Sequence, residues 1–397
     1  MKLRSLTLAC AAAALVSAPA SAQSLFSTRG LGVPLPAVDA RARALGGIGV
    51  GLIGLNTSLV NPAEMAGISR RGVSAALQPS FGSVDVAEAE GDASASRFPM
   101  IRIMYPISSR FVFSLGYGGV LEQSWAIATE GDEQIGDQVV DTRDVVRSTG
   151  GVAQVTASLS YAVSPTLAVG LGGGMYTGSL LRQITRTFTE SEVPLSTFQT
   201  RLRWEYSGPS AVLGVVWDPD AAVRIGGALT VADELEITAK EGVAQNETVK
   251  LPLRATFGAS AFLSPDLIAT AGAEWSGRGS GDQALFASGN TLRRNTWRAG
   301  GGLEYQGVTT PSRTFPIRLG GSYTQLPFFE QGEEPGNEWS AAFGIGFRLA
   351  SDQTGPTAVA DVGVERGGRT GLVSAALPDG LSESFWRLTF SLSLFGR

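Results

Sequence analysis

The chain has 397 residues, of which 43% are hydrophobic, and carries 31 Lys and Arg against 36 Asp and Glu, a formal net charge of −5. It contains no histidine and one cysteine, Cys10. These counts disfavour histidine-based catalysis, thiolate metal sites and disulfides, and the acidic balance weighs against a nucleic-acid partner. We therefore predict no enzyme activity, no cofactor and no metal site.

Residues 1–22 have the pattern of a secretory signal peptide. Lys2 and Arg4 precede an apolar core, and residues 20–22 read ASA, an A-x-A cleavage box. A membrane anchor is the alternative, but Pro19 and the small-residue box disfavour it. Cleavage removes the only cysteine and leaves 29 basic and 36 acidic residues, a net charge of −7.

Residues 23–71 do not alternate between apolar and polar, and within them residues 49–54 read GVGLIG, a G-x-G-x-x-G spacing. In a dinucleotide-binding protein this motif follows a strand and opens a helix. No strand is predicted before Gly49, and Pro62 makes a long crossover helix improbable. We interpret the glycines as allowing close backbone packing. The low charge and apolar content favour a plug, or hatch, inside a barrel over a solvated periplasmic tail.

From Gly72 onward the sequence alternates with a period of two, which is typical of strands with one apolar and one polar face. Residues 154–163 read QVTASLSYAV, residues 254–263 read RATFGASAFL, and residues 339–349 read WSAAFGIGFRL. After the signal no run of 18 apolar residues occurs, which excludes a helical membrane protein. We predict about fourteen antiparallel strands over residues 72–397.

Both a soluble sandwich and a transmembrane barrel produce such alternation, and the connections favour the barrel. Short turns are predicted at residues 107–109, 164–165, 218–220 and 264–266. Longer, often acidic loops are predicted at Glu130–Asp141, Glu190–Ser196, Gly277–Asn290 and Glu330–Gly336. Short turns at one rim and long loops at the other are typical of bacterial barrels.

Aromatic residues and the last strand point the same way. Tyr161, Trp217, Tyr305, Trp339 and Trp386 fall near predicted strand ends, as interfacial girdles require. Residues 386–394 read WRLTFSLSL, which is similar to the C-terminal signal that barrel-assembly machinery recognises, although Gly396 and Arg397 follow it. We therefore predict contacts with that machinery and with the lipid bilayer, and a location in the outer membrane.

Alternation places several charged residues in the lumen, because an arginine facing lipid would cost about 2–4 kcal/mol at the midplane. They are Arg102, Arg224, Arg254, Arg318, Arg348 and Arg387, beside Glu304, Asp361 and Glu365. Two hypotheses remain open. Arg254, Arg318 and Arg348 bind a ligand carboxylate, or they form a structural lattice of ion pairs that anchors the plug through Glu64.

The N-terminal segment resembles the signature of the FadL/OmpP1/TodX family. The resemblance rests on residues 43–51 (RALGGIGVG), 56–58 (NTS), 61–63 (NPA) and 66–67 (AG), with Asn56 where an acidic residue is common in the family. Residues 318–320 and 383–388 are similar to distant members of the same superfamily. The hatch-motif positions are Gly46, Gly47, Gly49, Gly51, Gly54, Asn61, Pro62 and Ala63.

The resemblance implies an outer-membrane transporter of long-chain fatty acids or other hydrophobic compounds, with fourteen strands and an N-terminal hatch. In this family an inward kink of the third strand opens the wall sideways. The third strand is predicted at Arg110–Thr129, and Gly116, Gly118 and Gly119 are its candidate kink. The alternative is that these glycines only pack against the plug.

A second function class remains open: a non-transport barrel that binds a partner in a secretion or surface-attachment system. A continuous apolar pocket between the external loops and a wall gap would favour transport, and a lumen filled only by charge pairs would favour the partner role. Without histidine an outer-membrane enzyme is disfavoured, and a general porin lacks such a plug.

Overall fold

The computed structural model describes residues 24–86, 89–135, 138–189, 196–242, 246–278, 291–307, 309–310, 313–352, 355–375 and 377–396. The signal peptide predicted over residues 1–22 lies outside these ranges. So do most of the loops predicted at Glu190–Ser196 and Gly277–Asn290.

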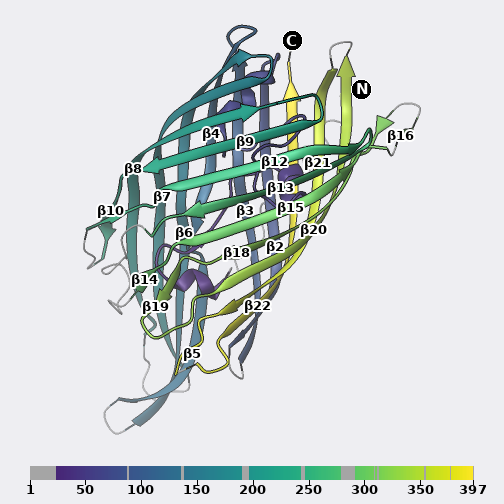
Figure 1. Cartoon of the computed structure of the whole chain (residues 1–397). Coiled ribbons are helices and arrows are strands. Elements are labelled where there is room, and N and C mark those ends of the chain that lie inside the picture. Colours follow the sequence, from purple (N-terminus) through teal and green to yellow (C-terminus); the bar gives the residue numbers. More distant parts are fainter. Residues whose placement is uncertain are drawn as a thin grey trace, which may run out of the picture.

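One antiparallel sheet closes on itself to form a barrel (Figure 1). Its strands are β2 (Gly72–Val86), β3 (Ala89–Pro106), β4 (Phe111–Glu122), β5 (Trp125–Ile135), β6 (Gln138–Ser164), β7 (Leu167–Thr189), β8 (Phe198–Trp217), β9 (Val223–Ala232), β10 (Glu234–Glu241), β11 (Glu247–Lys250), β12 (Arg254–Ser264), β13 (Leu267–Ser276), β15 (Thr296–Tyr305), β18 (Ile317–Gln325), β20 (Asn337–Asp352), β21 (Gly355–Gly371) and β22 (Leu381–Phe395). Pairing of β2 with β22, from Gly72 opposite Phe395 to Val86 opposite Leu381, joins the two ends of the sheet. The predicted fourteen-stranded antiparallel barrel is confirmed, because β4 with β5, β9 with β10 and β11 with β12 each form one span.

The apolar face of the sheet points outward. On β4 the side chains of Phe113, Leu115 and Tyr117 are exposed, whereas Val112 and Ser114 between them are buried. The buried charged residues lie on the opposite face, toward the lumen. An apolar outward face is favourable against lipid, and the charged groups pair inside. This arrangement separates the barrel from a sandwich.

The two ends of the barrel differ. Short turns connect the strands at one end, called here the turn end. At the other, the hairpin end, β5 to β8 project beyond the rest of the barrel (Figure 1). The loop predicted at Glu130–Asp141 is wrong, because β5 and β6 pair from Trp125 opposite Ser148 to Ile135 opposite Gln138. The alternating sequence here contains β-branched residues, so β5 and β6 continue beyond the apolar band of the barrel. The acidic residues predicted in a loop therefore lie on these two strands.

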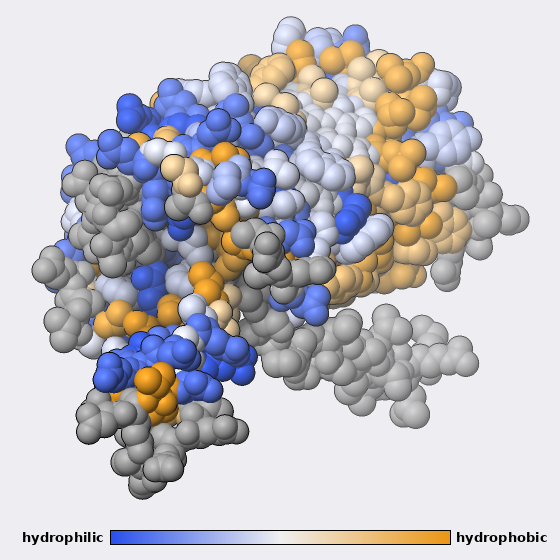
Figure 2. Space-filling model, turned by 90° about the horizontal axis from the view of Figure 1, so that it is seen from below, coloured by the Kyte–Doolittle hydropathy of each residue, from blue (hydrophilic) through white to orange (hydrophobic). Residues whose placement is uncertain are grey.

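Figure 2, seen from the hairpin end, shows hydrophilic residues gathered at this end and hydrophobic residues along the wall behind it. Apart from the main sheet, β14 (Thr291–Arg293) pairs with β19 (Phe328–Glu330), and β16 (Thr309–Thr310) pairs with β17 (Arg313–Thr314). Among the described residues no helix has the length and apolar character needed to cross a membrane.

Residues 24–71, called here the N-terminal segment, lie against the inner face of the barrel (Figure 1, purple). The segment contains η1 (Leu25–Thr28), β1 (Val33–Pro34), α2 (Ala40–Ala44) and η2 (Pro62–Gly67). α2 packs against β18, β20, β21 and β22, and η2 packs against β6, β7 and β8 on the other side of the lumen. All five residues of α2 are buried.

Candidate functional site

α2 carries two arginines that reach separate ionic networks on the barrel wall. The Arg41 guanidinium donates from Nε to Glu304 Oε2 at 2.7 Å, and it also donates to the carbonyl oxygens of Ile53 and Leu55. Arg318 donates to the same Glu304 oxygen at 2.7 Å and to Asp361 Oδ1 at 2.6 Å. Arg41 thus ties the helix, the glycine turns that follow it and the wall together.

The second network begins at Arg43, whose Nε lies 3.8 Å from Glu365 Oε2. Arg387 bridges Glu365 at 3.2 Å and Glu338 at 2.9 Å. Arg369 then bridges Glu338 and Glu383. Ser24 Oγ and the Leu25 N–H also donate to Glu383, at 2.8 and 2.6 Å, so both ends of this network hold the N-terminal segment.

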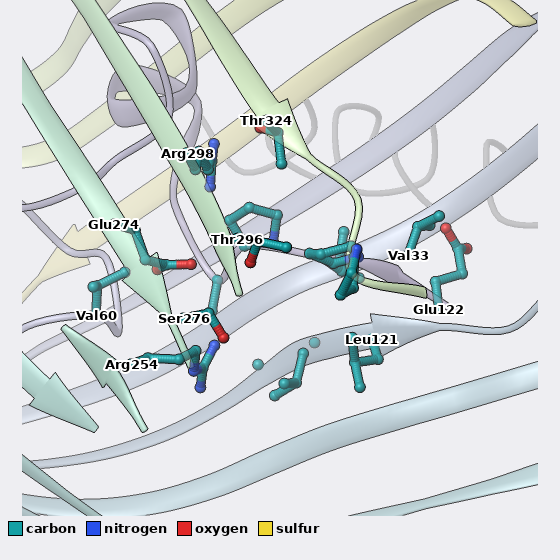
Figure 3. A pocket seen from close by; sticks show the side chains of 18 of the residues that line it. Val33, Val60, Leu121, Glu122, Arg254, Glu274, Ser276, Thr296, Arg298 and Thr324 are labelled. Atoms are coloured by element: carbon teal, nitrogen blue, oxygen red, sulfur yellow. The ribbon is translucent and has the colours of Figure 1, made fainter. Parts of the chain in front are cut away.

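A cavity of about 130 Å³ lies between the N-terminal segment and the wall. Its two sides differ (Figure 3): Val33, Leu121 and Glu122 lie opposite Arg254, Glu274 and Arg298, which come from β12, β13 and β15. The lining also includes Leu35, Pro36, Ala37 and Leu59, and Val60 lies beside Glu274 and Arg254. The cavity therefore combines aliphatic side chains with arginines and carboxylates.

Guanidinium N–H groups on the basic side of the cavity remain available to a ligand. Arg298 is buried, and although it lies near Glu274, Glu338 and Glu365 it forms no hydrogen bond with a described residue. Arg254 interacts with Tyr176 and Glu274. A carboxylate placed in the cavity would find guanidinium groups that the ionic networks do not consume.

The barrel wall is interrupted beside this cavity, between β3 and β4. Their ladder runs from Pro106 opposite Val112 to Met100 opposite Gly118 and stops there, although β3 continues along β2 for eleven more residues, 89–99. Pro99 has no N–H to donate to a further rung. On the other side, β4 has a bulge between Gly119 and Leu121 in its pairing with β6.

The N-terminal segment occupies the edge of β4 that β3 has left. β1 pairs with β4, with Val33 opposite Glu122 and Pro34 opposite Leu121, and the Leu35 N–H donates to the Val120 carbonyl at 2.9 Å. An ion pair between Arg97 of β3 and Glu122 of β4, both buried, spans the interruption. The wall is thus completed by a strand that does not belong to the barrel.

A second cavity, of about 500 Å³, lies at the turn end between η2 and the wall. Glu64 lines it and is buried; its Oε1 accepts the Gly51 N–H at 2.7 Å, and its Oε2 lies 4.0 Å from Arg224 Nη1 without a hydrogen bond. Burial raises the pKa of Glu64 to about 7, against the opposing effects of the Gly51 N–H and Arg224.

The glycines of the hatch motif lie where the segment turns against the wall. Gly46, Gly47, Gly49, Gly51 and Gly54 all have positive φ. A Cβ on Gly46 would lie 2.3 Å from Gly301 N, and one on Gly51 would lie 2.3 Å from Gly258 O. At these two positions the backbone of the segment lies directly against the backbone of the wall, and a side chain on the segment residue would prevent this contact.

Asn61, Pro62 and Ala63 form the start of η2. The Asn61 side chain accepts from the Ala63 N–H at 3.0 Å and donates to the Val215 carbonyl at 3.0 Å, while Ser160 donates to the Pro62 carbonyl at 2.5 Å. The motif therefore caps a short helix and fastens it to two strands of the wall.

Gly116, Gly118 and Gly119 of the predicted third strand face the N-terminal segment. A Cβ at these positions would meet Leu59 at 2.5 Å, Ala37 at 2.7 Å and Leu35 at 2.4 Å respectively. The span predicted at Arg110–Thr129 consists of two strands, β4 and β5, separated by Gln123 and Ser124.

The structure separates the four residues predicted as a ligand or ion-pair group. Arg318 bonds to Glu304 and Asp361 of the wall, Glu64 accepts the Gly51 N–H, and Arg254 lines the cavity. Arg348 is exposed near the end of β20, and its lumen position remains a prediction. The register of β20 with β21 shifts just after Arg348, where the strand leaves the regular ladder at the turn end.

Sequence reasoning missed Arg41, Arg43, Arg97, Glu122 and Arg298. Neither arginine of α2 follows from the alternation that places the charged residues of the wall. The available signal was the placement of two arginines in a short segment otherwise made of alanine and glycine, where a charged side chain needs a buried partner. No sequence pattern signalled Arg97 and Glu122, because their contact depends on where the ladder stops.

A family model described as BamG matches residues 1–240 of the chain. No curated protein matches the chain. Among solved structures it is similar to a Pseudomonas aeruginosa FadL homologue, at 16% identity and a TM-score of 0.59, over 91% of this chain and 98% of the other. The toluene transporter TbuX of Ralstonia pickettii (17%, 0.58, 91% and 99%) and the toluene transporter TodX of P. putida (13%, 0.56, 91% and 99%) are also similar. At these identities the likeness shows the fold alone.

Proposed function

The chain belongs to the BamG family, and we propose that it is an outer-membrane channel that takes up hydrophobic small molecules and releases them sideways into the membrane. The observation that carries this proposal is the interruption between β3 and β4, which adjoins the cavity and is filled by β1. In a barrel without a lateral opening, we would expect β3 and β4 to stay paired with each other instead of leaving an edge of β4 for β1.

An apolar molecule gains nothing from a watery pore, because its favourable environment is the bilayer itself. The proposed path therefore leads from the cavity through the wall, past Gly116, Gly118 and Gly119, against which side chains of the N-terminal segment pack in this conformation. In this path the segment is the hatch, and the glycine turns at residues 46–54 are the part that yields.

The cavity is small in this conformation. Its volume of about 130 Å³ is below the range of roughly 300–1,000 Å³ usual for ligand pockets. Toward the hairpin end, an apolar cluster around Leu31 that includes Trp204, Tyr206 and Phe328 packs next to it. Entry of a ligand thus requires that residues 24–37 move.

We propose long-chain fatty acids as the substrates. The apolar side of the cavity suits an aliphatic chain, and Arg254 and Arg298 suit a carboxylate at its end. The alternative within the same class is a neutral hydrocarbon, which would use the aliphatic side only.

The proposed location is the outer membrane, reached by export with the signal peptide at residues 1–22 and by recognition of the last strand by the barrel-assembly machinery. β22 supports this, because its outward side chains Trp386, Leu392 and Leu394 are exposed while its inward ones are buried.

The decisive experiment is flux into proteoliposomes. Purified protein is reconstituted, and uptake of radiolabelled oleate and of toluene is compared with that of empty vesicles; co-purifying lipid is identified by mass spectrometry. Saturable oleate uptake that falls at least tenfold in Arg254→Met/Arg298→Met, with toluene uptake unchanged, supports the fatty-acid assignment. Uptake at the level of empty vesicles for both compounds refutes transport and favours the partner-binding role.

A further inference from the structure

Beyond the interruption that β1 fills, the two sides of the wall diverge toward the hairpin end and leave two free strand edges. One belongs to residues 91–98 of β3, called here the β3 rim, which pair only with β2. The other belongs to β5, which pairs only with β6. On their open sides neither rim makes a backbone hydrogen bond with a described residue.

The notch between the rims begins within the apolar band of the barrel. Outward side chains on β3 remain apolar up to Phe98, which is 55% exposed, whereas the β3–β4 ladder has already ended at Met100. Unpaired N–H and C=O groups cost several kcal/mol each where lipid surrounds them, and open sheet edges are not found there. The part of the β3 rim nearest the bilayer therefore requires a partner for its backbone.

The side chains of the β3 rim leave the edge accessible. Residues 93–96 read ASAS, and Ser96, which points outward, is exposed. Natural sheets usually protect a free edge with proline, long charged side chains or a covering loop. Here Pro99 lies at the base of the notch, and Arg97, the long charged side chain of the rim, is buried and pairs with Glu122, so it does not cover the edge.

The charge of the rims selects the kind of partner. Asp92 on β3 and Glu130 and Asp132 on β5 are exposed. Asp92 and Asp132 form no ion pair with a described residue, and Glu130 has only Arg143 at 3.9 Å, in an exposed pair. An extended segment placed between the rims would therefore be favoured by Lys or Arg side chains.

We propose that this notch receives an extended, basic segment of a second membrane protein, which adds a strand to the β3 rim. Main-chain hydrogen bonds to the free edge supply affinity, and Asp92, Glu130 and Asp132 supply the preference for basic side chains. The interaction does not depend on the proposed transport, because the lateral path past Gly118 lies nearer the turn end than the rims.

A defined peptide tests the site on the full-length protein in detergent micelles. The probe is a fluorescent octapeptide of alternating Lys and Val, with alternating Glu and Val as its counterpart. We expect saturable binding of the basic peptide only, at least tenfold weaker in Asp92→Lys/Asp132→Lys, with amide exchange slowed in residues 91–98. The control Glu234→Lys/Asp266→Lys makes the same charge change away from the notch and should bind like the wild type.

Absence of saturable binding, an equal loss in the control, or exchange protection only outside the rims overturns the proposal. In native membranes, a photo-crosslinking residue at Ser96 should give a protein adduct that disappears in the Asp92→Lys/Asp132→Lys background, and one at Leu319, on the opposite wall, should not. An adduct of two copies of this chain, or with lipid alone, also overturns it. Oleate flux measured in the same variants distinguishes a failure of the binding proposal from a failure of the transport proposal.

Discussion

Glu64 is the titratable residue of the N-terminal segment best placed to make its docking depend on pH. Its carboxylate accepts a hydrogen bond from the Gly51 N–H, and Arg224, which is bonded to Asp218, lies 4.0 Å from its second oxygen. Asn56, Asp218 and Arg102 are its other polar neighbours. Burial in this environment favours the protonated form.

The raised pKa sets the sign of the pH dependence. An unfolded Glu64 loses its proton near pH 4.5, and the folded residue keeps it until about pH 7. The stabilisation is therefore complete below pH 4.5, declines by at most about 1.4 kcal/mol per pH unit and is lost above pH 7. We expect the thermal midpoint in detergent to fall over this range, and Glu64→Gln to remove that part of the slope. An unchanged slope in Glu64→Gln would contradict the assignment.

Arg41 and Arg203 compare a buried with an exposed ion pair. Arg41 bonds to Glu304 with both groups buried, whereas Arg203 and its partners Glu205 and Glu241 are about half exposed. Breaking a buried pair costs about 3–5 kcal/mol because a charge is stranded, and an exposed pair contributes about 0–1 kcal/mol. Arg41→Met should therefore lower the thermal midpoint strongly and Arg203→Met hardly at all. Equal effects would mean that Arg318 alone satisfies Glu304.

At the scale of elements, the glycine turns act through backbone contact rather than conformational freedom alone. Gly51 has φ +70° and its missing Cβ would overlap Gly258 O, whereas Gly332 has φ +91° with open space around it. Gly332→Ala measures the cost of positive φ, about 1–2 kcal/mol. Gly51→Ala adds the overlap and should lower the thermal midpoint further and displace the segment. Proteolysis between residues 46 and 54 reports that displacement, and identical behaviour of the two variants would contradict it.

The pairing of β1 with β4 can be locked with a disulfide, because residues 23–397 contain no cysteine. A disulfide between Pro34→Cys and Leu121→Cys joins facing positions of the two strands. If the segment must leave the wall, oxidation should reduce oleate flux at least tenfold and reduction should restore it. Ser322→Cys/Ser340→Cys is the matched control, since these hydroxyls lie 2.9 Å apart on adjacent wall strands. Flux that persists in the oxidised Pro34–Leu121 pair would exclude this path.

At the scale of the whole molecule, the N-terminal segment and two ionic networks lie against the inner face of the wall. Deleting residues 24–71 leaves Glu304 with Arg318, and Glu365 with Arg387, so the wall keeps its own ion pairs. The deleted barrel should fold and conduct ions, while the full chain should show much smaller conductance in planar bilayers. Equal conductance would mean that the segment does not obstruct the lumen.

The sequence alone determined the architecture of the wall. A two-residue period fixes which side chains share a face, and an outward apolar face with inward arginines is consistent only with a closed sheet in lipid. Residues 154–163 and 254–263 show this pattern without help from distant residues. The same reasoning failed for the loop at Glu130–Asp141, because strand ends depend on where pairing stops and not on the period.

Only the tertiary structure decided which contacts hold the N-terminal segment and where the wall is interrupted. The partners of Arg41, Arg43 and Glu64 lie up to hundreds of residues away, and no local pattern specifies them. The stop of the β3–β4 ladder at Met100 and Gly118 depends on two strands and on the β1 segment at once. A local period is set by neighbouring residues, whereas an interruption, a cavity and a free edge exist only between segments that folding brings together.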